Sequence, residues 1–358
     1  MWWLSGIHRD VILYAKSSKA HIWDLHARPE VQVPSGGASS APGGLRVDVT
    51  VRSHAAGSAS EVQGQCSVTA SLYGPHMLRP GDTHADPPPQ VQKVFSGLEL
   101  TFSQGGGVGE EGGKVGGAHA GVASVETSVG PVELWSAEAP WLYTLVVVVN
   151  GPDGKVLDVE VARVGFRSVE IQGNKLLING AAPYIYGVNR HEHDQHTGKY
   201  CDYAAMIRDI RLLKQYNFNA VRCSHYPNRQ LWYSLCDAYG LYVVDEANIE
   251  SHGLALETRE ALLADADDWL DCFQERYERM VMRDRGHACI VVWSLGNEAS
   301  YGKNHDKIYA WSKENDPTRP VQYESCGGAP ATDIICPMYP SVDKLKRLAG
   351  IAEQVRKP

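Results

Sequence analysis

Short runs of alternating apolar and polar residues dominate the first half of the chain. Residues 45–52, 66–73 and 142–149 each repeat with the two-residue period of a strand that buries one face. An Asp-Gly pair at 153–154 separates the last of these runs from a similar run at 156–162, which is the pattern of a β-hairpin. Regularly spaced short strands of this kind predict an immunoglobulin-like β-sandwich of about 100 residues.

Two stretches rich in small residues interrupt this pattern. Residues 34–44 are rich in Pro, Gly, Ser and Ala, and residues 103–122 carry nine of the 35 glycines. Gly107, Gly109 and Gly112 match the GxGxxG spacing of a dinucleotide-binding loop, but no amphipathic helix follows them. A surface loop is therefore the favoured interpretation of this second stretch, and both stretches are predicted to be inserts in the sandwich.

After about residue 170, strand-like apolar runs alternate with amphipathic segments. The runs span residues 184–188, 220–224, 241–244, 290–295, 321–323 and 334–336. The helical stripes are Met206, Ile210 and Leu213, then Trp269, Phe273, Tyr277 and Met280. Strict alternation predicts parallel strands joined by crossover helices. A closed (β/α)₈ barrel needs eight strands and the pattern supplies about six, so the prediction is a truncated TIM barrel.

These patterns predict three parts of the chain. Residues 1–18 are expected to form one strand with a turn, belonging to a domain that the chain does not contain. Residues 19–169 are expected to form the β-sandwich, and residues 170–358 the partial TIM barrel.

Composition narrows the functional classes. The chain has 34 Lys and Arg against 42 Asp and Glu, a formal net charge of −8, which gives no electrostatic attraction to nucleic acid or to an anionic membrane. No window approaches a membrane span and no signal peptide is readable, so a cytoplasmic protein is the expectation. The eight cysteines form no CxxC pair and are expected to be reduced and mostly buried.

Polar side chains gather where the apolar runs of the second half end. In a TIM barrel, the carboxyl ends of all strands face the active site. The polar segments are residues 189–193, 222–228, 245–252, 296–298, 324 and 336–339. Their convergence on one face predicts a catalytic or binding site.

Glu298 and its neighbour Asn297 close one of these runs. A carboxyl group bordered by apolar and aromatic residues can have a raised pKa and act as a general acid. Asn297 could then hold a substrate hydroxyl. The alternative is that this pair caps the helix expected to start near Asn304.

Glu250 and His252 are two residues apart, so they face the same side of an extended segment. Together with Glu298 they predict a metal site, for which the mixed donors favour zinc or manganese. A hydrogen-bonded surface pair is the alternative. The run of His191, Glu192 and His193 permits the same metal interpretation, and with it a metal hydrolase.

Other polar residues at the strand ends have supporting roles in this interpretation. Arg222 is predicted to orient a neighbouring carboxylate. His225 either donates to a sugar hydroxyl or is a core histidine with satisfied hydrogen bonds. Glu246 and Glu324 are expected to form hydrogen bonds inside the barrel mouth, and the aromatic pair at 232–233 to belong to the core.

Five segments closely resemble the β-galactosidases of glycoside hydrolase family 2. They are residues 187–193, 219–228, 242–253, 293–298 and 334–339. The Arg-His-Glu-His and Ile-Glu-Ser-His-Gly sequences within them point to β-galactosidases rather than to the glucuronidases or mannosidases of that family. The resemblance covers residues 1–30 and roughly 125–340.

The resemblance implies a retaining glycosidase that hydrolyses terminal β-galactosides such as lactose, with Glu298 as general acid/base. It implies Mg²⁺ rather than zinc at Glu250, His252 and Glu298. It also implies contacts with galactose or its transition state from His191, His225 and Asn297, and a hydrogen bond from Tyr339, next to Met338, to the catalytic nucleophile.

Compared with the family, the chain is expected to be incomplete. The nucleophilic glutamate of the family ends a seventh strand beyond residue 358, and an aspartate that binds sugar and Na⁺ lies upstream of residue 1. On this basis residues 1–18 are a jelly-roll remnant, the Na⁺ ligands are mostly missing, and the chain alone is inactive. A homo-oligomer is one expectation for the full-length protein. The alternatives are a non-catalytic galactoside-binding or assembly module, or another family 2 glycosidase.

Overall fold

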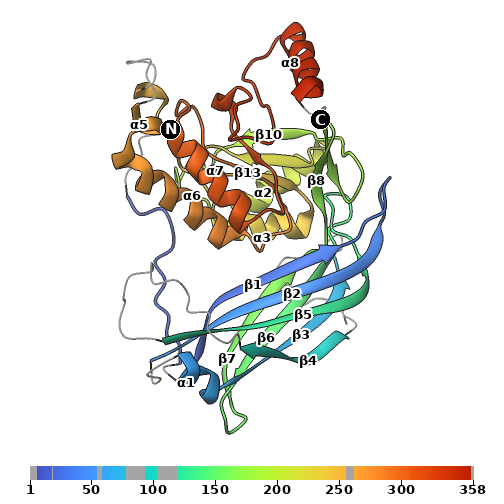
Figure 1. Ribbon diagram of the computed structural model, residues 1–358, viewed down its shortest axis with the longest axis vertical. Coiled ribbons are helices and arrows are strands. Elements are labelled where there is room, and N and C mark those ends of the chain that lie inside the picture. The colour runs from blue at the N-terminus through green and yellow to red at the C-terminus, as the bar shows by residue number, and fades with distance from the viewer. Residues whose placement is uncertain are drawn as a thin grey trace.

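The structure is a computed structural model that describes residues 6–17, 19–54, 59–77, 93–102, 119–254 and 262–355. Figure 1 shows a set of long antiparallel strands beneath a second unit in which strands and helices alternate. No helix in the described residues is long and apolar enough to cross a membrane. All eight cysteines are free and five of them are buried, as predicted, whereas Cys272 is exposed.

The first unit is a seven-stranded antiparallel sheet that curls around its own core. Its spatial order is β1-β2-β5-β4-β3-β6-β7, and β1 also contacts β7. The strands are β1 (His21–Val31), β2 (Ser40–Ser53), β3 (Ser67–His76), β4 (Lys93–Phe102), β5 (His119–Glu133), β6 (Leu142–Asn150) and β7 (Val156–Val164). Alternate residues of β2 and β6 are buried, which confirms the two-residue period.

The predicted hairpin forms between β6 and β7, where Gly154 has a positive φ of 76°. The prediction that residues 34–44 form an insert is wrong from Ser40 onward, where β2 begins. Those residues pair with β5 through a register shift beside Gly43, because two adjacent glycines allow the strand to continue irregularly. Residues 119–122 likewise belong to β5, and the GxGxxG match lies outside the described residues.

The strand predicted near the N-terminus is wrong for residues 6–17, which contain neither helix nor strand. Ion pairs hold this segment instead of strand pairing. Arg9 pairs with the buried Glu192, and Lys16 Nζ donates to Asp158 Oδ2 at 3.0 Å. The segment therefore contacts the side chains of both units.

The second unit contains a five-stranded parallel sheet with the strands in chain order, β10-β11-β12-β13-β14. They are β10 (Gly187–Arg190), β11 (Ala220–Cys223), β12 (Tyr242–Glu246), β13 (Ile290–Ser294) and β14 (Val321–Gln322). Every residue of β13 is buried, as is typical of a parallel strand covered on both faces. A short hairpin of β8 (Val169–Gln172) and β9 (Lys175–Ile178) precedes this sheet.

Two of the predicted strands differ from the structure. The first begins at Gly187 rather than at 184, because Asn219 binds the preceding backbone through Tyr184 O and Tyr186 N. The predicted strand at 334–336 is reduced to a single parallel bridge between Gln322 and Ile334. Hydrogen bonds to the Asn219 side chain thus replace strand pairing just before β10. At the other edge of the sheet, beyond β14, strand pairing is reduced to one bridge.

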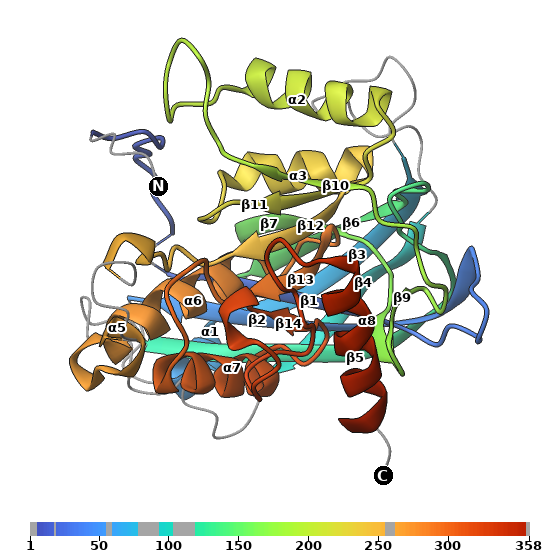
Figure 2. The ribbon, with the colours of Figure 1, turned by 90° about the horizontal axis from the view of Figure 1, so that it is seen from above.

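Helices follow the strands in chain order, as Figure 2 shows. They are α1 (Ala59–Gln65) in the first unit and α2 (Tyr203–Gln215), α3 (Gln230–Tyr239), α5 (Leu262–Asp265), α6 (Leu270–Asp284), α7 (Lys303–Asn315) and α8 (Val342–Val355) in the second. Two short 3₁₀ turns are η1 (Asp267–Trp269) and η2 (Glu324–Cys326). The predicted helical stripes are buried except Leu213, which is partly buried, and Trp269, which lies in η1 and is 44% exposed.

Buried hydrogen bonds join the two units. Arg167 Nε donates to Ala288 O and its Nη2 to Ile290 O, both at 2.5 Å. Trp135 Nε1 donates to Asp237 O at 2.8 Å. Because each of these donors is buried, its hydrogen bond avoids the cost of an unpaired polar group and fixes how the units meet.

Candidate active site

The predicted metal ligands converge at the carboxyl ends of β12 and β13. One donor atom from each of Glu250, His252 and Glu298 lies within 4.8 Å of the others. His252 Nδ1 is 3.0 Å from Glu298 Oε2. The residues fit a divalent cation, because two carboxyl groups and an imidazole offer oxygen and nitrogen donor atoms close to one another.

Backbone contacts bring the two strand ends together at this cluster. Asn297 N donates to Ile249 O at 2.9 Å, and Glu250 and Asn297 form a parallel bridge. Gly296, with a φ of 147°, makes the close approach possible, since a Cβ there would lie 2.6 Å from Ile249 O. Glu298 itself has a φ of 45°, a strained conformation for a residue other than glycine.

Asn297 connects the candidate acid/base with the rest of the site. Its Nδ2 donates to Glu250 Oε2 at 2.7 Å and to Glu298 Oε2 at 3.4 Å. Its Oδ1 accepts from Arg222 Nη2 at 2.9 Å, which fixes the orientation of the amide. The capping alternative for this pair is wrong, because α7 begins at Lys303 with Gly302 as its N-cap residue.

Glu298 is partly accessible, with 23% of its side chain exposed. Its backbone N–H donates to Glu324 Oε1 at 2.8 Å, so Glu324 forms the predicted hydrogen bond in the mouth. The next residue, Ala299, donates its N–H to Tyr323 Oη at 3.0 Å. These two bonds hold the strained turn that presents the Glu298 carboxylate.

Glu246 is buried at the end of β12 and accepts hydrogen bonds from three side chains. Arg222 Nε lies 2.7 Å and Ser294 Oγ 2.6 Å from its Oε2, and His225 Nδ1 lies 2.7 Å from its Oε1. Arg222 therefore orients a carboxylate, as predicted, and it also carries the link to Asn297. His225 is not a core residue, because 19% of its side chain is exposed.

His191 lies against His225 with ring centroids 5.4 Å apart, edge to face. Burial, followed by the nearby His225, lowers the pKa of His191. The neighbouring Glu192 turns away into the interior, where it pairs with Arg9 and accepts from Arg229 N at 3.0 Å. Residues 191–193 thus form no three-donor metal cluster in the part of the chain that the structure describes.

The structure does not bring Met338 and Tyr339 into this arrangement. They are 45% and 97% exposed, and Tyr339 has a φ of 45°. The segment before them is anchored through Cys336, whose Sγ lies 2.6 Å from Gln322 Oε1. Trp232 and Tyr233 are fully buried, as predicted.

Sequence reasoning missed Ser294 and Gln322. Both are buried strand residues, and Gln322 Nε2 donates to Ser294 Oγ at 2.6 Å. The available signal was a serine inside the otherwise apolar run at 290–295, since a buried hydroxyl requires a partner.

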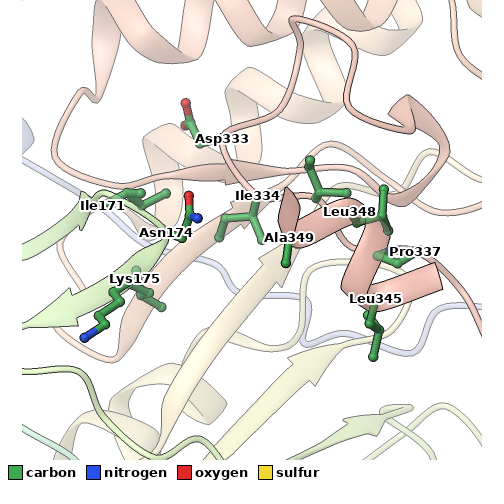
Figure 3. A pocket seen from close by; sticks show the side chains of 11 residues that line it. Ile171, Asn174, Lys175, Asp333, Ile334, Pro337, Leu345, Leu348 and Ala349 are labelled. Carbon is green, nitrogen blue, oxygen red and sulfur yellow. The ribbon is translucent and has the colours of Figure 1, made fainter. Parts of the chain in front are cut away.

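A cavity of about 390 Å³ lies elsewhere, between the β8–β9 hairpin and α8. Figure 3 shows that its wall is largely apolar, with Lys175 and Asp333 at its edge. It is lined by none of the predicted catalytic or metal-binding residues. The candidate site therefore remains the cluster around Glu298.

Two sequence profiles match the chain. "Glycosyl hydrolases family 2, TIM barrel domain" matches residues 169–358, and "Glycosyl hydrolases family 2" matches residues 97–167. The first covers more than half of the chain. The chain belongs to glycosyl hydrolase family 2, which confirms the resemblance and the TIM-barrel class of the second unit.

Two curated relatives are similar in sequence to this chain over more than half of its length. A protein named "Beta-galactosidase" from Pectobacterium atrosepticum is 56% identical over 223 residues, which are 62% of this chain and 21% of the relative. One of the same name from Enterobacter cloacae is 58% identical over 219 residues, 60% of this chain and 21% of the relative. The matched region is about a fifth of the length of these relatives.

Solved structures share the fold. Bifidobacterium dentium beta-glucuronidase has a TM-score of 0.65 at 23% identity, covering 89% of this chain and 46% of the other. Ruminococcus gnavus beta-glucuronidase has a TM-score of 0.63 at 21% identity, covering 89% and 47%. At this identity the likeness extends to the fold and not to the substrate.

Proposed function

We propose that the whole protein is a β-galactosidase that hydrolyses terminal β-galactosides, such as lactose, with retention of configuration. The observation that carries the proposal is the cluster of Glu298, Asn297, Glu250 and His252 at the strand ends. It lies in the region matched by the family's TIM-barrel profile, and the curated relatives that are 56–58% identical are named "Beta-galactosidase". The substrate class rests on that identity, because family 2 also contains glucuronidases.

Glu298 is the proposed general acid/base. In the first step it gives its proton to the glycosidic oxygen as the leaving group departs, and in the second it takes a proton from the attacking water. The retaining mechanism also needs a nucleophilic carboxylate about 5–5.5 Å from the acid. Glu246 and Glu324 are already engaged by neighbouring donors, so we place the nucleophile in a part of the whole protein outside this chain.

We further propose that Glu250, His252 and Glu298 hold Mg²⁺. Their donor atoms lie close enough together for one ion. When bound, the ion would supply positive charge beside the acid/base and would counter the repulsion between the carboxylates of Glu250 and Glu298. His191 and His225 lie near one another at the next strand ends, where we expect them to contact the hydroxyl groups of the sugar.

The test is a chimera in which residues 169–358 replace the matching region of the Enterobacter cloacae relative. We expect it to hydrolyse lactose, and Glu298→Gln to lower its turnover by about 10²–10⁴-fold. The matched control is Glu275→Gln, which alters a largely exposed carboxylate on α6 and should leave turnover unchanged. A folded chimera that cleaves glucuronides instead, or that retains lactose turnover after Glu298→Gln, would contradict the proposal.

A further inference from the structure

The three hydrogen bonds to Glu246 have fixed directions. Arg222 can only donate, because a guanidinium has no acceptor atom. It does so to Glu246 Oε2 at 2.7 Å. With a cation at this distance, the buried Glu246 carboxyl is an ionised acceptor rather than a donor.

A chain of buried side chains fixes the direction at Ser294 in the same way. Burial raises the pKa of the Cys336 thiol to about 12, so this group is a donor, and its partner is Gln322 Oε1. The amide hydrogens of Gln322 then face Ser294 Oγ at 2.6 Å. The hydroxyl hydrogen of Ser294 must go elsewhere, and Glu246 Oε2 at 2.6 Å is closer than Gly296 O at 3.3 Å.

Only one direction remains for the third bond. Glu246 Oε1 lies 2.7 Å from His225 Nδ1, and an ionised carboxylate cannot donate. His225 must therefore carry a hydrogen on Nδ1. In the neutral ring this leaves Nε2 without a hydrogen, as a hydrogen-bond acceptor.

We propose that Glu246 is a positioning residue that holds His225 as the Nδ1–H tautomer, so that the neutral ring offers Nε2 as an acceptor to a hydroxyl hydrogen of the substrate. The second half of this inference rests on the proposed function. It differs from the first of the two alternatives drawn from the sequence, in which His225 donates to a sugar hydroxyl. An acceptor nitrogen pairs with a sugar hydroxyl and repels a carboxylate oxygen, so the same residue would contribute to discrimination against uronic acids.

The variant Glu246→Gln has a predictable effect on this tautomer. The new carbonyl oxygen should face Arg222 and Ser294, since the guanidinium cannot accept from an amide. The amide hydrogens would then face His225 Nδ1, where two donors cannot share a hydrogen bond. The imidazole hydrogen should therefore move to Nε2.

The experiment is long-range proton–nitrogen NMR of the whole chain labelled with nitrogen-15 at histidine, at a pH where imidazoles are neutral. The chain has 14 histidines, so His225→Gln identifies the relevant signal. We expect Nδ1–H in the wild type, Nε2–H in Glu246→Gln, and Nδ1–H in the matched control Ser294→Ala, which keeps the Glu246 carboxylate.

An Nε2–H signal from His225 in the wild type would overturn the proposal, and this result does not require Glu246→Gln to fold. An unchanged tautomer in folded Glu246→Gln would overturn it as well. Neither result depends on turnover, so they are distinguishable from failure of the chimera to hydrolyse lactose. Conversely, an inactive chimera with Nδ1–H at His225 would reject the function and leave the positioning role.

Discussion

His305 should make the stability of the chain depend on pH. This residue of α7 is fully buried, stacks on Tyr323 with ring centroids 4.2 Å apart, and meets the edge of Phe273 at 5.2 Å. Neither ring nitrogen has a hydrogen-bond partner among the described residues. Burial lowers the pKa of His305 from 6.5 to about 3, because a charged imidazole would lose its hydration between these rings.

The sign and the size follow from linkage. The folded chain disfavours the protonated ring, so the contribution of His305 is fully present above the unfolded pKa and is lost as the pH falls toward the folded value. With values of about 3 folded and 6.5 unfolded, the contribution of His305 to the free energy of unfolding should fall by about 1.4 kcal/mol between pH 7.5 and pH 5.5. At about pH 4.5 the loss should reach roughly 2.7 kcal/mol.

The assay is urea unfolding at about pH 7.5 and about pH 5.5, comparing the wild type with His305→Phe. The phenyl ring keeps the aromatic packing and removes the titration. Between these two pH values, the free energy of unfolding of His305→Phe should therefore fall by about 1.4 kcal/mol less than that of the wild type. The exposed His196→Phe, which also removes one histidine, should keep the wild-type dependence. Equal losses in the wild type and His305→Phe would refute the reasoning.

Three further predictions concern packing and the metal site. Trp232→Ala should lower the free energy of unfolding by about 3–5 kcal/mol in urea, because the indole is fully buried; a loss below about 1 kcal/mol would contradict this packing. Gly240→Ala should destabilise the joint between the units, since its Cβ would lie 2.3 Å from Ala137 O at a φ of 75°; an unchanged melting temperature would contradict it. Glu250→Gln should weaken Mn²⁺ binding measured by electron paramagnetic resonance, whereas Glu275→Gln should not; equal affinities would argue against the metal site.

Local periodicity and chemistry predicted much of the architecture. The apolar run at 290–295 contains a strand buried on both faces. The Asp-Gly pair at 153–154 lies in the turn of the predicted hairpin between β6 and β7. The sequence alone predicts Glu250 and Glu298 on one face, because parallel strands end at a shared edge of the sheet, and the structure brings their donor atoms together. These features depend on residues near in sequence or on a general property of the fold.

Other features depend on partners that periodicity cannot identify. Trp269 continues a helical stripe in the sequence, yet the chain turns into a 3₁₀ segment there and leaves the indole half exposed. The apolar residues 334–336 have strand character but form a single bridge. The hydrogen bonds of Glu246 come from the ends of two different strands, β11 and β13, so only the folded sheet reveals their common acceptor.

The central claim is that Glu298 is the general acid/base of a galactoside-cleaving site, and its most direct test is leaving-group dependence. The chimera and its Glu298→Gln variant would be compared on lactose and on a dinitrophenyl galactoside, whose leaving group needs no proton. The account predicts a loss of about 10²–10⁴-fold on lactose and a much smaller loss of the first step on the activated substrate. Equal losses on both substrates, or none on lactose, would contradict it.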